Sequence, residues 1–203
     1  MVKVSDHYFS SSPSSDFQKG LIKTFLRGKE YTFLTASGLF SYKRIDNGTR
    51  LLVESMKIPE KGSLLDLGCG IGVIGIVAAC ENNNLDVMMS DVNPRAVMIA
   101  GENVNRMGLR NIKVVKGYLY EPFKGMIFDT IVSNPPVSAG MSRVVKPLVR
   151  KAPEHLRKGG SIQLVIQSQK GANMLSNFLE KAFGNYEVLS RSGGFRVLFS
   201  IKN

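Results

Sequence analysis

Tryptophan is absent from this sequence of 203 residues, and cysteine and histidine occur only twice each. The two cysteines, Cys69 and Cys80, form no Cys-x-x-Cys pair, and neither His7 nor His155 lies near them along the chain. Such a chain lacks the ligand set of a zinc site, so we expect no metal. Two isolated cysteines are also typical of a reducing compartment rather than of a disulfide-bonded secreted domain.

Long apolar runs are missing as well. No run reaches the about 20 apolar residues that a membrane-spanning helix needs. The first residues, MVKVSDHYFSSSPSSDF, lack the apolar core of a signal peptide. We therefore expect a cytoplasmic protein without a membrane partner.

Acidic residues are scarce relative to basic ones. Asp and Glu number 16 and Lys and Arg number 27, which gives a net charge of +11. Solubility alone is one explanation of this excess, and attraction to a polyanion, most commonly a nucleic acid, is the other. Together with the motifs below, the charge favours RNA as the partner.

What the sequence does contain, from residue 61 onward, is an alternation of apolar strands and helical stretches. We predict strands at 63–68, 85–91, 111–117, 128–134 and 161–167, helices at 73–81, 94–108, 145–157 and 172–184, and two last strands at 186–192 and 195–203 joined by Gly193-Gly194. This order predicts an α/β fold with a Rossmann-like, doubly wound, seven-stranded sheet, mostly parallel with an antiparallel last strand.

Residues 1–60 contain too little apolar sequence for a core of their own. They predict a helix near 16–27, a short strand pair near 31–42 and a helix near 47–57. We expect this segment to form an N-terminal cap on the domain of residues 61–203.

A glycine loop follows the first strand of that domain. The stretch LLDLGCGIGVIG places Asp66, Gly68, Gly70 and Gly72 between a strand and a helix. Glycines permit the tight turn and let a ligand lie against the backbone. Asp91 ends the next strand, where an acidic side chain accepts hydrogen bonds from ribose hydroxyls.

Two cofactors suit such a loop, a nicotinamide dinucleotide and S-adenosylmethionine. A dinucleotide places its pyrophosphate at the helix N-terminus, where the carboxylate of Asp66 would repel it. S-adenosylmethionine carries an ammonium and a sulfonium group, and an acidic residue would attract these positive charges. The loop therefore favours S-adenosylmethionine as a methyl donor.

A further motif ends the strand at 128–134, which runs into Asn134-Pro135-Pro136. Two prolines cannot continue a sheet ladder, and they restrict the conformation of the residue before them. With the glycine loop and the acidic strand end, this motif resembles class I methyltransferases that act on exocyclic or amide nitrogens. The stretches HYFSSSP, TASGLFSYKRIDNGTRLL, NPPVSAG and GGFRV resemble the small-subunit ribosomal RNA guanine-N2 methyltransferase family, in its compact single-domain form, over about 7–203.

The resemblance implies an S-adenosylmethionine-dependent N-methyltransferase of RNA, acting on the guanine N2 of ribosomal RNA, with 61–203 as the methyltransferase domain. Asn134, Pro135 and Pro136 would form the catalytic motif. The oxygen of Asn134 and the carbonyl of Pro135 would accept the two N–H groups of an exocyclic amine and turn its lone pair toward the methyl group. Catalysis is then mainly placement, and an Asp at position 134 should be less harmful than an Ala because it keeps an acceptor.

The resemblance implies contacts of Phe40 and Ser41 with the methionine end of the cofactor. It also implies cofactor contacts at Val92, Tyr118 and Asn134, in addition to those of the glycine loop and Asp91. Two positions depart from the pattern of related methyltransferases. Val137 stands where adenine- and glutamine-specific relatives carry a stacking ring, so another ring, or none, holds the base, and Phe40, Tyr8 and Phe195 are the candidates. Tyr118 stands where many relatives bind the adenine amino group with Asp.

Basic residues follow the Asn-Pro-Pro motif, at Arg143, Lys146, Arg150, Lys151, Arg157 and Lys158. Positions 143, 146, 150 and 157 would share one helical face, which suits either an RNA backbone or solvent. The alternatives to an RNA methyltransferase are an adenine-N6 or protein-glutamine methyltransferase, a small-molecule methyltransferase, and a non-catalytic RNA-binding subunit.

Overall fold

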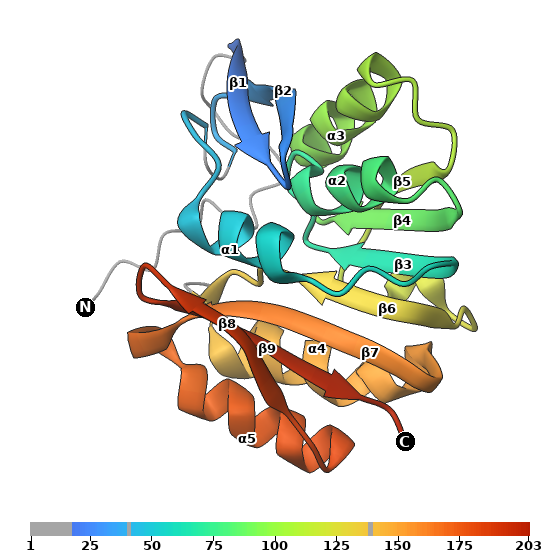
Figure 1. Cartoon of the computed structure of the whole chain (residues 1–203), viewed down its shortest axis with the longest axis vertical. Helices are drawn as coiled ribbons and strands as arrows, with labels where there is room; N and C mark the ends of the chain where they lie inside the picture. The colour runs from blue at the N-terminus through green and yellow to red at the C-terminus, as the bar shows by residue number, and fades with distance from the viewer. Residues whose placement is uncertain (1–17, 40–41, 138–139) are drawn as a thin grey trace.

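The computed structural model describes residues 18–39, 42–137 and 140–203. A seven-stranded sheet with the order β5-β4-β3-β6-β7-β9-β8 forms its centre (Figure 1). Its strands are β3 (Gly62–Leu67), β4 (Leu85–Asp91), β5 (Ile112–Lys116), β6 (Phe128–Ser133), β7 (Leu156–Gln167), β8 (Glu187–Ser192) and β9 (Phe195–Ile201). β9 is antiparallel to both of its neighbours, β7 and β8, and all other neighbouring strands in this sheet are parallel. The predicted Rossmann-like fold with an antiparallel last strand is confirmed.

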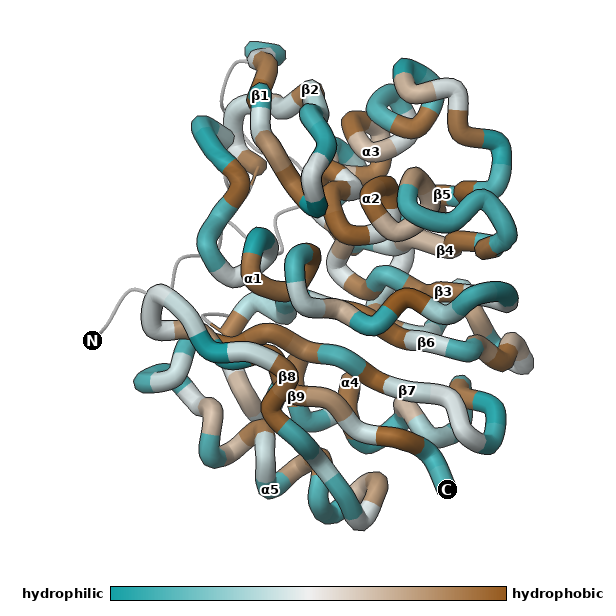
Figure 2. The backbone as a smooth tube through the Cα atoms, in the orientation of Figure 1, coloured by the Kyte–Doolittle hydropathy of each residue, from teal (hydrophilic) through white to brown (hydrophobic). Residues whose placement is uncertain are grey.

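Helices cover both faces of the sheet (Figure 1). One face carries α1 (Asn47–Ser55), α2 (Val73–Glu81) and α3 (Pro94–Arg106), and the other carries α4 (Lys146–Lys151) and α5 (Ala172–Phe183). Successive residues of a strand point to opposite faces, so Val132 of β6 joins the core beneath α1 and α2 while Ile131 joins the core beneath α4 and α5. Figure 2 shows the apolar residues along the central strands.

The N-terminal segment corrects one prediction. Residues near 16–27 were expected to form a helix, but β1 (Lys19–Leu26) pairs antiparallel with β2 (Lys29–Ala36). Ile22 and Leu26 are buried while Leu21 and Phe25 are exposed, and both a helix and a strand allow that spacing. Arg27 and Gly28 both have positive φ, as the two-residue turn of a hairpin requires.

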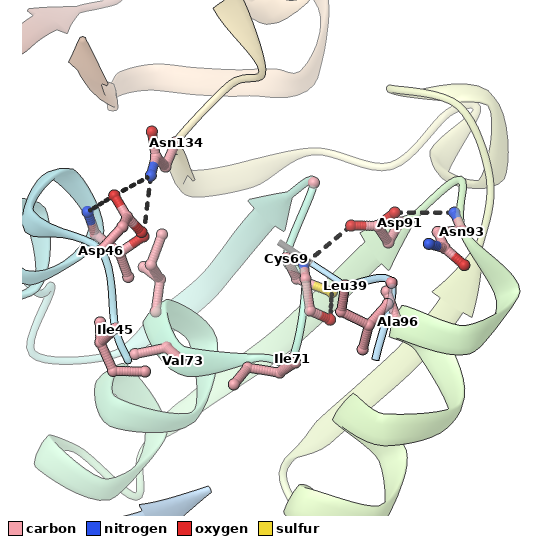
Figure 3. Close-up of a pocket in the computed structure, with 15 residues that line it drawn as sticks. Leu39, Ile45, Asp46, Cys69, Ile71, Val73, Asp91, Asn93, Ala96 and Asn134 are labelled. Carbon is pink, nitrogen blue, oxygen red and sulfur yellow. Dashed lines mark hydrogen bonds between the residues drawn. The ribbon is translucent and has the colours of Figure 1, made fainter. Parts of the chain in front are cut away.

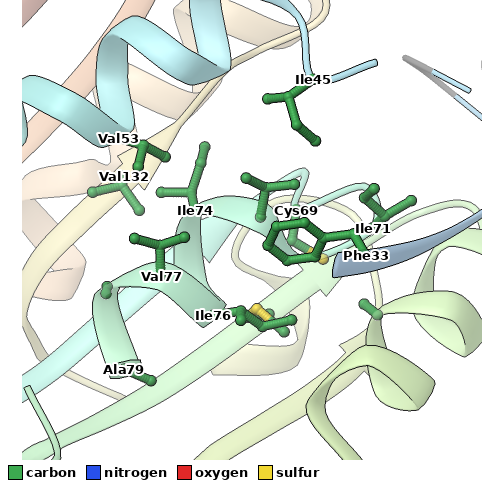
Figure 4. Packing of buried hydrophobic residues seen from close by; sticks show 14 of the residues in the cluster. Phe33, Ile45, Val53, Cys69, Ile71, Ile74, Ile76, Val77, Ala79 and Val132 are labelled. Atoms are coloured by element: carbon green, nitrogen blue, oxygen red, sulfur yellow. The ribbon is translucent and has the colours of Figure 1, made fainter. Parts of the chain in front are cut away.

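The hairpin and α1 share a core with the main sheet rather than forming one of their own. Phe33 of β2 is fully buried in the same hydrophobic core as Ile45, Cys69 and Ile71 (Figure 4). The helix predicted near 47–57 is confirmed as α1. The division into a cap at 1–60 and a domain at 61–203 stays a prediction.

The helix predicted at 145–157 is interrupted in the structure. A π-helical turn, Met141–Val145, leads into α4, and a 3-10 turn, Ala152–His155, follows it. Pro147 and Pro153 cannot donate helical hydrogen bonds from within a longer helix. The next strand, β7, therefore begins at Leu156, earlier than its apolar run suggested.

Candidate active site

The glycine loop between β3 and α2 is closed by hydrogen bonds to β4. The N–H groups of Gly68 and Cys69 donate to the carbonyl of Ser90, at 2.8 and 2.9 Å. Gly68 and Gly70 have φ values of 70° and 56°, in the left-handed region that favours glycine. A Cβ atom built on either glycine would meet no atom within 4 Å. Both glycines therefore border open space.

Gly72 has a different surrounding. It precedes the first residue of α2 with a φ of 90°, and a Cβ atom there would come within 3.0 to 3.4 Å of Ile76, Met89 and Ala100. Close packing of the helix start requires a glycine here, and Gly72 does not line the pockets described below. Its predicted cofactor contact stays a prediction.

Asp91 ends β4 and ties the glycine loop to that strand. Its carboxylate accepts the N–H groups of Gly70 and Asn93, both at 2.9 Å. Burial raises the pKa of Asp91, and the backbone N–H groups partly offset the rise. The sequence did not single out Asn93, whose side chain caps α3 by accepting the N–H of Arg95 at 2.9 Å.

Asp66 lies beneath the loop rather than in the pocket. It is fully buried, and one carboxylate oxygen accepts the N–H of Gly75, in the first turn of α2, at 3.0 Å. The other oxygen has no hydrogen-bond partner among the described residues. Burial, partly offset by the Gly75 N–H, raises the pKa of Asp66 to about 7. The cofactor contact predicted for Asp66 stays a prediction.

A pocket opens between the glycine loop, the end of β4 and the start of α1 (Figure 3). Its empty volume is about 740 Å³ with its open mouth included. The predicted residues Gly68, Gly70, Asp91 and Asn134 line it. The stretch GLFSYKRIDNGT, at 38–49, supplies further walls at residues that were not predicted individually: Gly38, Leu39, Ile45, Asp46 and Thr49.

A second hollow adjoins the first and shares Gly68 and Asp91 with it. It is lined by four more of the predicted residues: Val92, Tyr118, Pro135 and Pro136. The hydroxyl of Tyr118 donates to the carbonyl of Arg143 at 2.8 Å, which holds the tyrosine against the π-helical turn. The next residue, Leu119, has a φ of 49°, a conformation that few residues other than glycine adopt.

Asn134 leaves the end of β6 and reaches the N-terminus of α1. Its amide nitrogen donates to a carboxylate oxygen of Asp46 at 3.1 Å and to the hydroxyl of Thr49 at 2.9 Å (Figure 3). The same oxygen of Asp46 accepts the N–H groups of Gly48 and Thr49, both at 3.0 Å, and so caps α1. The only signal of this contact in the sequence is the Asp-Asn-Gly-Thr helix start.

The remaining predicted residues divide into three groups. Phe40, Ser41 and Tyr8 lie outside the described residues. Phe195 follows the Gly193-Gly194 turn, and its ring would lie 3.0 Å from a Cβ atom built on Gly48, so it packs beside the Asp46 cap. Val137 packs against the core beneath α4 and α5.

The basic residues do not form one helical face. Lys146 and Arg150 belong to α4. Arg157 instead belongs to β7 and pairs with Asp129, near the amino-terminal ends of β6 and β7, at the opposite end of these strands from the pocket. The π-helical turn and the 3-10 turn break the regular spacing on which the prediction rested. Val144 and Leu148 point inward to the second hollow, while Lys146 and Arg150 are exposed.

Residues 30–199 match the model of the methyltransferase small domain family. The chain belongs to this family. It is therefore an S-adenosylmethionine-dependent methyltransferase of class I, as the glycine loop and the Asn-Pro-Pro motif predicted. A Bacillus subtilis protein named YbxB is 36% identical over 197 residues, which cover 96% of this chain and 98% of that protein.

Other relatives carry names that state an activity. Ribosomal RNA small subunit methyltransferase C of Haemophilus influenzae is 32% identical over 97% of this chain, which spans 60% of that protein's length. The solved structure of the Thermus thermophilus 16S rRNA N2 methyltransferase RsmC, in complex with AdoMet and guanosine, has a TM-score of 0.82 and 24% identity. That likeness covers 95% of this chain and 52% of the solved chain, and it shows the shared fold.

Residues 18–39, 42–137 and 140–203 bring together no group of three or more His, Cys, Asp or Glu side chains that could hold a metal ion. The helices of this part of the chain are too short or too polar to span a membrane.

Proposed function

We propose that this chain transfers a methyl group from S-adenosylmethionine to the exocyclic N2 of guanine in ribosomal RNA. The observation that carries the proposal is the position of Asn134, at the end of β6 and in the wall of the same pocket as Gly68, Gly70 and Asp91. A group held at Asn134 would therefore face a cofactor held by the glycine loop.

The pocket fits the cofactor. The open space over Gly68 and Gly70 lets a ligand approach the backbone, and the carboxylate of Asp91 borders that space. Asp91 would accept hydrogen bonds from the ribose hydroxyls. The second hollow, with Val92 and Tyr118 in its wall, would take the adenine ring.

The methionine end would lie toward Gly38 and Leu39, next to the predicted contacts Phe40 and Ser41. We propose that residues 1–60 form a cap that completes the site of the domain at 61–203, since this segment supplies one wall of the pocket. Asp66 and Gly72 would then support the loop from below and hold α2 in place.

Asn134, Pro135 and Pro136 would act on the target base. S-adenosylmethionine, when bound, supplies a methyl group on a positively charged sulfur. The side-chain oxygen of Asn134 and the carbonyl of Pro135 would accept the two N–H groups of the amine, so that its lone pair points at the cofactor. The prolines restrain the backbone that carries both acceptors, because each fixes its own φ.

The base needs a stacking partner other than Val137, because valine has no aromatic ring. Among the described residues, the ring of Phe195 lies against Gly48, two residues from Asp46 in the pocket wall. We propose that Phe195 stacks on the guanine. Stacking of a base on an aromatic ring contributes about 1–3 kcal/mol.

RNA as the substrate, in the cytoplasm, is supported by the net charge of +11 and by the exposed Lys146 and Arg150 of α4, the helix whose Leu148 lines the second hollow. Contacts with phosphates release counterions, so RNA affinity should fall steeply between low and physiological salt. Replacing both residues by Glu should flatten that slope. The exposed Lys158, near the start of β7 and so at the far end of this strand from the pocket, is the matched control. Its replacement by Glu should change the slope less.

The proposed function is tested by identifying the methylated nucleoside. The enzyme is incubated with methyl-labelled S-adenosylmethionine and unmodified total RNA, and the RNA is digested to nucleosides. We expect the label in N2-methylguanosine, and no further label in RNA that the enzyme has already methylated. Label in N6-methyladenosine, or none in RNA but label in added proteins, would contradict the proposal.

A further inference from the structure

The amide of Asn134 has only one orientation that satisfies its surroundings. Asp46 presents a carboxylate oxygen 3.1 Å from the amide nitrogen, and a carboxylate only accepts hydrogen bonds. If the amide were rotated by 180°, its oxygen would meet this carboxylate without a hydrogen between them. The nitrogen must therefore face Asp46, and the oxygen must face away.

Thr49 completes the arrangement. Its hydroxyl oxygen lies 2.9 Å from the same nitrogen, so both N–H groups of Asn134 have an acceptor. Thr49 is buried in the first turn of α1, and Asp46 is fixed by accepting the N–H groups of Gly48 and Thr49. Figure 3 shows the oxygen of Asn134 on the side of the amide away from Asp46. The start of α1 thus holds the amide at two points.

We propose that Asp46 and Thr49 are positioning residues that hold the carbonyl oxygen of Asn134 toward the substrate. The site then offers an acceptor, never a donor, to the incoming group. It selects nucleophiles that carry N–H groups, such as an exocyclic amine, and rejects groups that present only acceptors, such as a carbonyl or an alkoxide. The proposal rests on the proposed function, because it concerns the same methyl transfer.

The two contacts also link distant parts of the chain. Asp46 and Thr49 precede Asn134 by 88 and 85 residues, and they belong to the N-terminal segment. Pro135 and Pro136 fix the backbone beyond Asn134 but leave its side-chain torsions free. The start of α1 therefore supplies the side-chain orientation that the prolines cannot.

Thr49→Val tests the proposal, because valine keeps the shape of threonine and loses only the hydroxyl. We expect the single-turnover rate to fall roughly tenfold, the effect of one hydrogen bond, while the affinity for S-adenosylmethionine stays within about twofold. Thr49→Ser restores the hydroxyl and should restore most of the rate. Thr130→Val is the matched control: Thr130 is also buried and its hydroxyl also has a side-chain partner, the hydroxyl of Ser161, yet the rate of this variant should be unchanged.

A double-mutant cycle separates positioning from general damage. If Thr49 acts through Asn134, Thr49→Val should not lower the single-turnover rate further in the Asn134→Ala background. Asp46→Ser gives an independent test, because serine still caps a helix but has a shorter side chain than aspartate. It should keep the melting temperature within a few degrees and lower the rate at least as much as Thr49→Val.

The outcomes distinguish this proposal from the proposed function. The positioning role would be overturned if folded Thr49→Val and Asp46→Ser had the wild-type rate. It would also be overturned if Thr49→Val lowered the rate by the same factor in the wild-type and Asn134→Ala backgrounds. Either result would leave the guanine assignment standing. Label in another amine-bearing nucleoside, with the cycle as expected, would overturn the guanine assignment and leave the positioning role standing. Methylation of a hydroxyl or a carbonyl oxygen would overturn both.

Discussion

The glycine loop and the Asn-Pro-Pro loop line one pocket but are held by different kinds of contact. The glycine loop is held by the next strand along the chain, β4. Gly68 and Cys69 donate hydrogen bonds to Ser90, and Gly70 donates one to Asp91, which is 21 residues away. Asn134 is held by Asp46, which is 88 residues away. The first loop is built within one strand-helix-strand unit, whereas the second depends on the N-terminal segment.

This difference separates the two tasks of the site. Backbone groups and φ values shape the glycine loop, so its ligand contacts tolerate changes in most nearby side chains. A single side chain carries the task of the Asn-Pro-Pro loop, and its orientation depends on two other side chains. Damage at the glycine loop should therefore change cofactor affinity, and damage around Asn134 should change the rate.

The largest effect is expected when an introduced negative charge disrupts the contact between Asn134 and Asp46. The motif alone predicts that Asn134→Asp is milder than Asn134→Ala, but Asp46 changes that expectation, because the introduced carboxylate would face another carboxylate. We expect Asn134→Asp to lower the single-turnover rate about 100- to 1000-fold, no better than Asn134→Ala. The double variant Asp46→Asn/Asn134→Asp should recover part of the rate, because the amide and the carboxylate exchange places. A rate for Asn134→Asp near that of the wild type would refute the contact.

Asp66 offers a test on stability. Because burial raises the pKa of Asp66 to about 7, the folded state keeps a proton that the unfolded state releases near pH 4. The free energy of unfolding should therefore fall as the pH rises from about 4 to about 7. Asp66→Asn removes this dependence, so the variant should be more stable than the wild type above pH 7, by an amount on the order of a few kcal/mol.

Urea unfolding at pH 5 and pH 8 measures the effect of Asp66→Asn, and equal differences from the wild type at both values would contradict the role of burial. The affinity for S-adenosylmethionine distinguishes the two roles considered for Asp66. An unchanged affinity fits support of α2 through Gly75. A loss of tenfold or more would indicate the contact with the cofactor that the sequence predicted.

Asp91→Ala should weaken cofactor binding by about 1–3 kcal/mol, because it leaves ribose hydroxyls and the N–H of Gly70 without an acceptor. The single-turnover rate at saturating cofactor should change far less. Calorimetry on this variant and on Asp86→Ala, an exposed aspartate of the same strand, measures the difference. If Asp91→Ala lowered the rate and left the affinity intact, the division of tasks between the two loops would be wrong.

The smallest effect is expected at Phe195. Phe195→Ala should raise the KM for RNA by about fivefold, near the lower end of the stacking range, and leave cofactor affinity unchanged. Phe25→Ala removes an exposed ring of β1 and serves as the control. Equal effects of the two substitutions would argue against stacking at Phe195.

The parts of the fold that follow from local pattern were predictable. The helix at 73–81 and the strand at 85–91 were predicted with the bounds of α2 and β4, because each has an apolar sequence bounded by glycine, asparagine or proline. The Gly193-Gly194 turn identified the antiparallel last strand, since two glycines permit the positive φ values of a hairpin turn.

Features that depend on tertiary packing were not predictable. The spacing of Ile22 and Leu26 suits either a helix or a strand, and only pairing with β2 decides between them. The contact from Asp46 to Asn134 joins two motifs that were each visible alone, but nothing in either one indicates the other. The burial of Asp66 likewise depends on how α2 lies on the sheet, so its sequence position beside the glycines suggested a ligand contact.

The central claim, that Asn134 acts on the substrate while the glycine loop binds the cofactor, is tested most directly by Asn134→Ala. Single-turnover methyl transfer and S-adenosylmethionine affinity are measured on the same preparation. We predict a rate about 100- to 1000-fold below that of the wild type, with the affinity within about threefold of the wild-type value. A wild-type rate, or a loss of rate fully explained by a loss of cofactor affinity, would contradict the account.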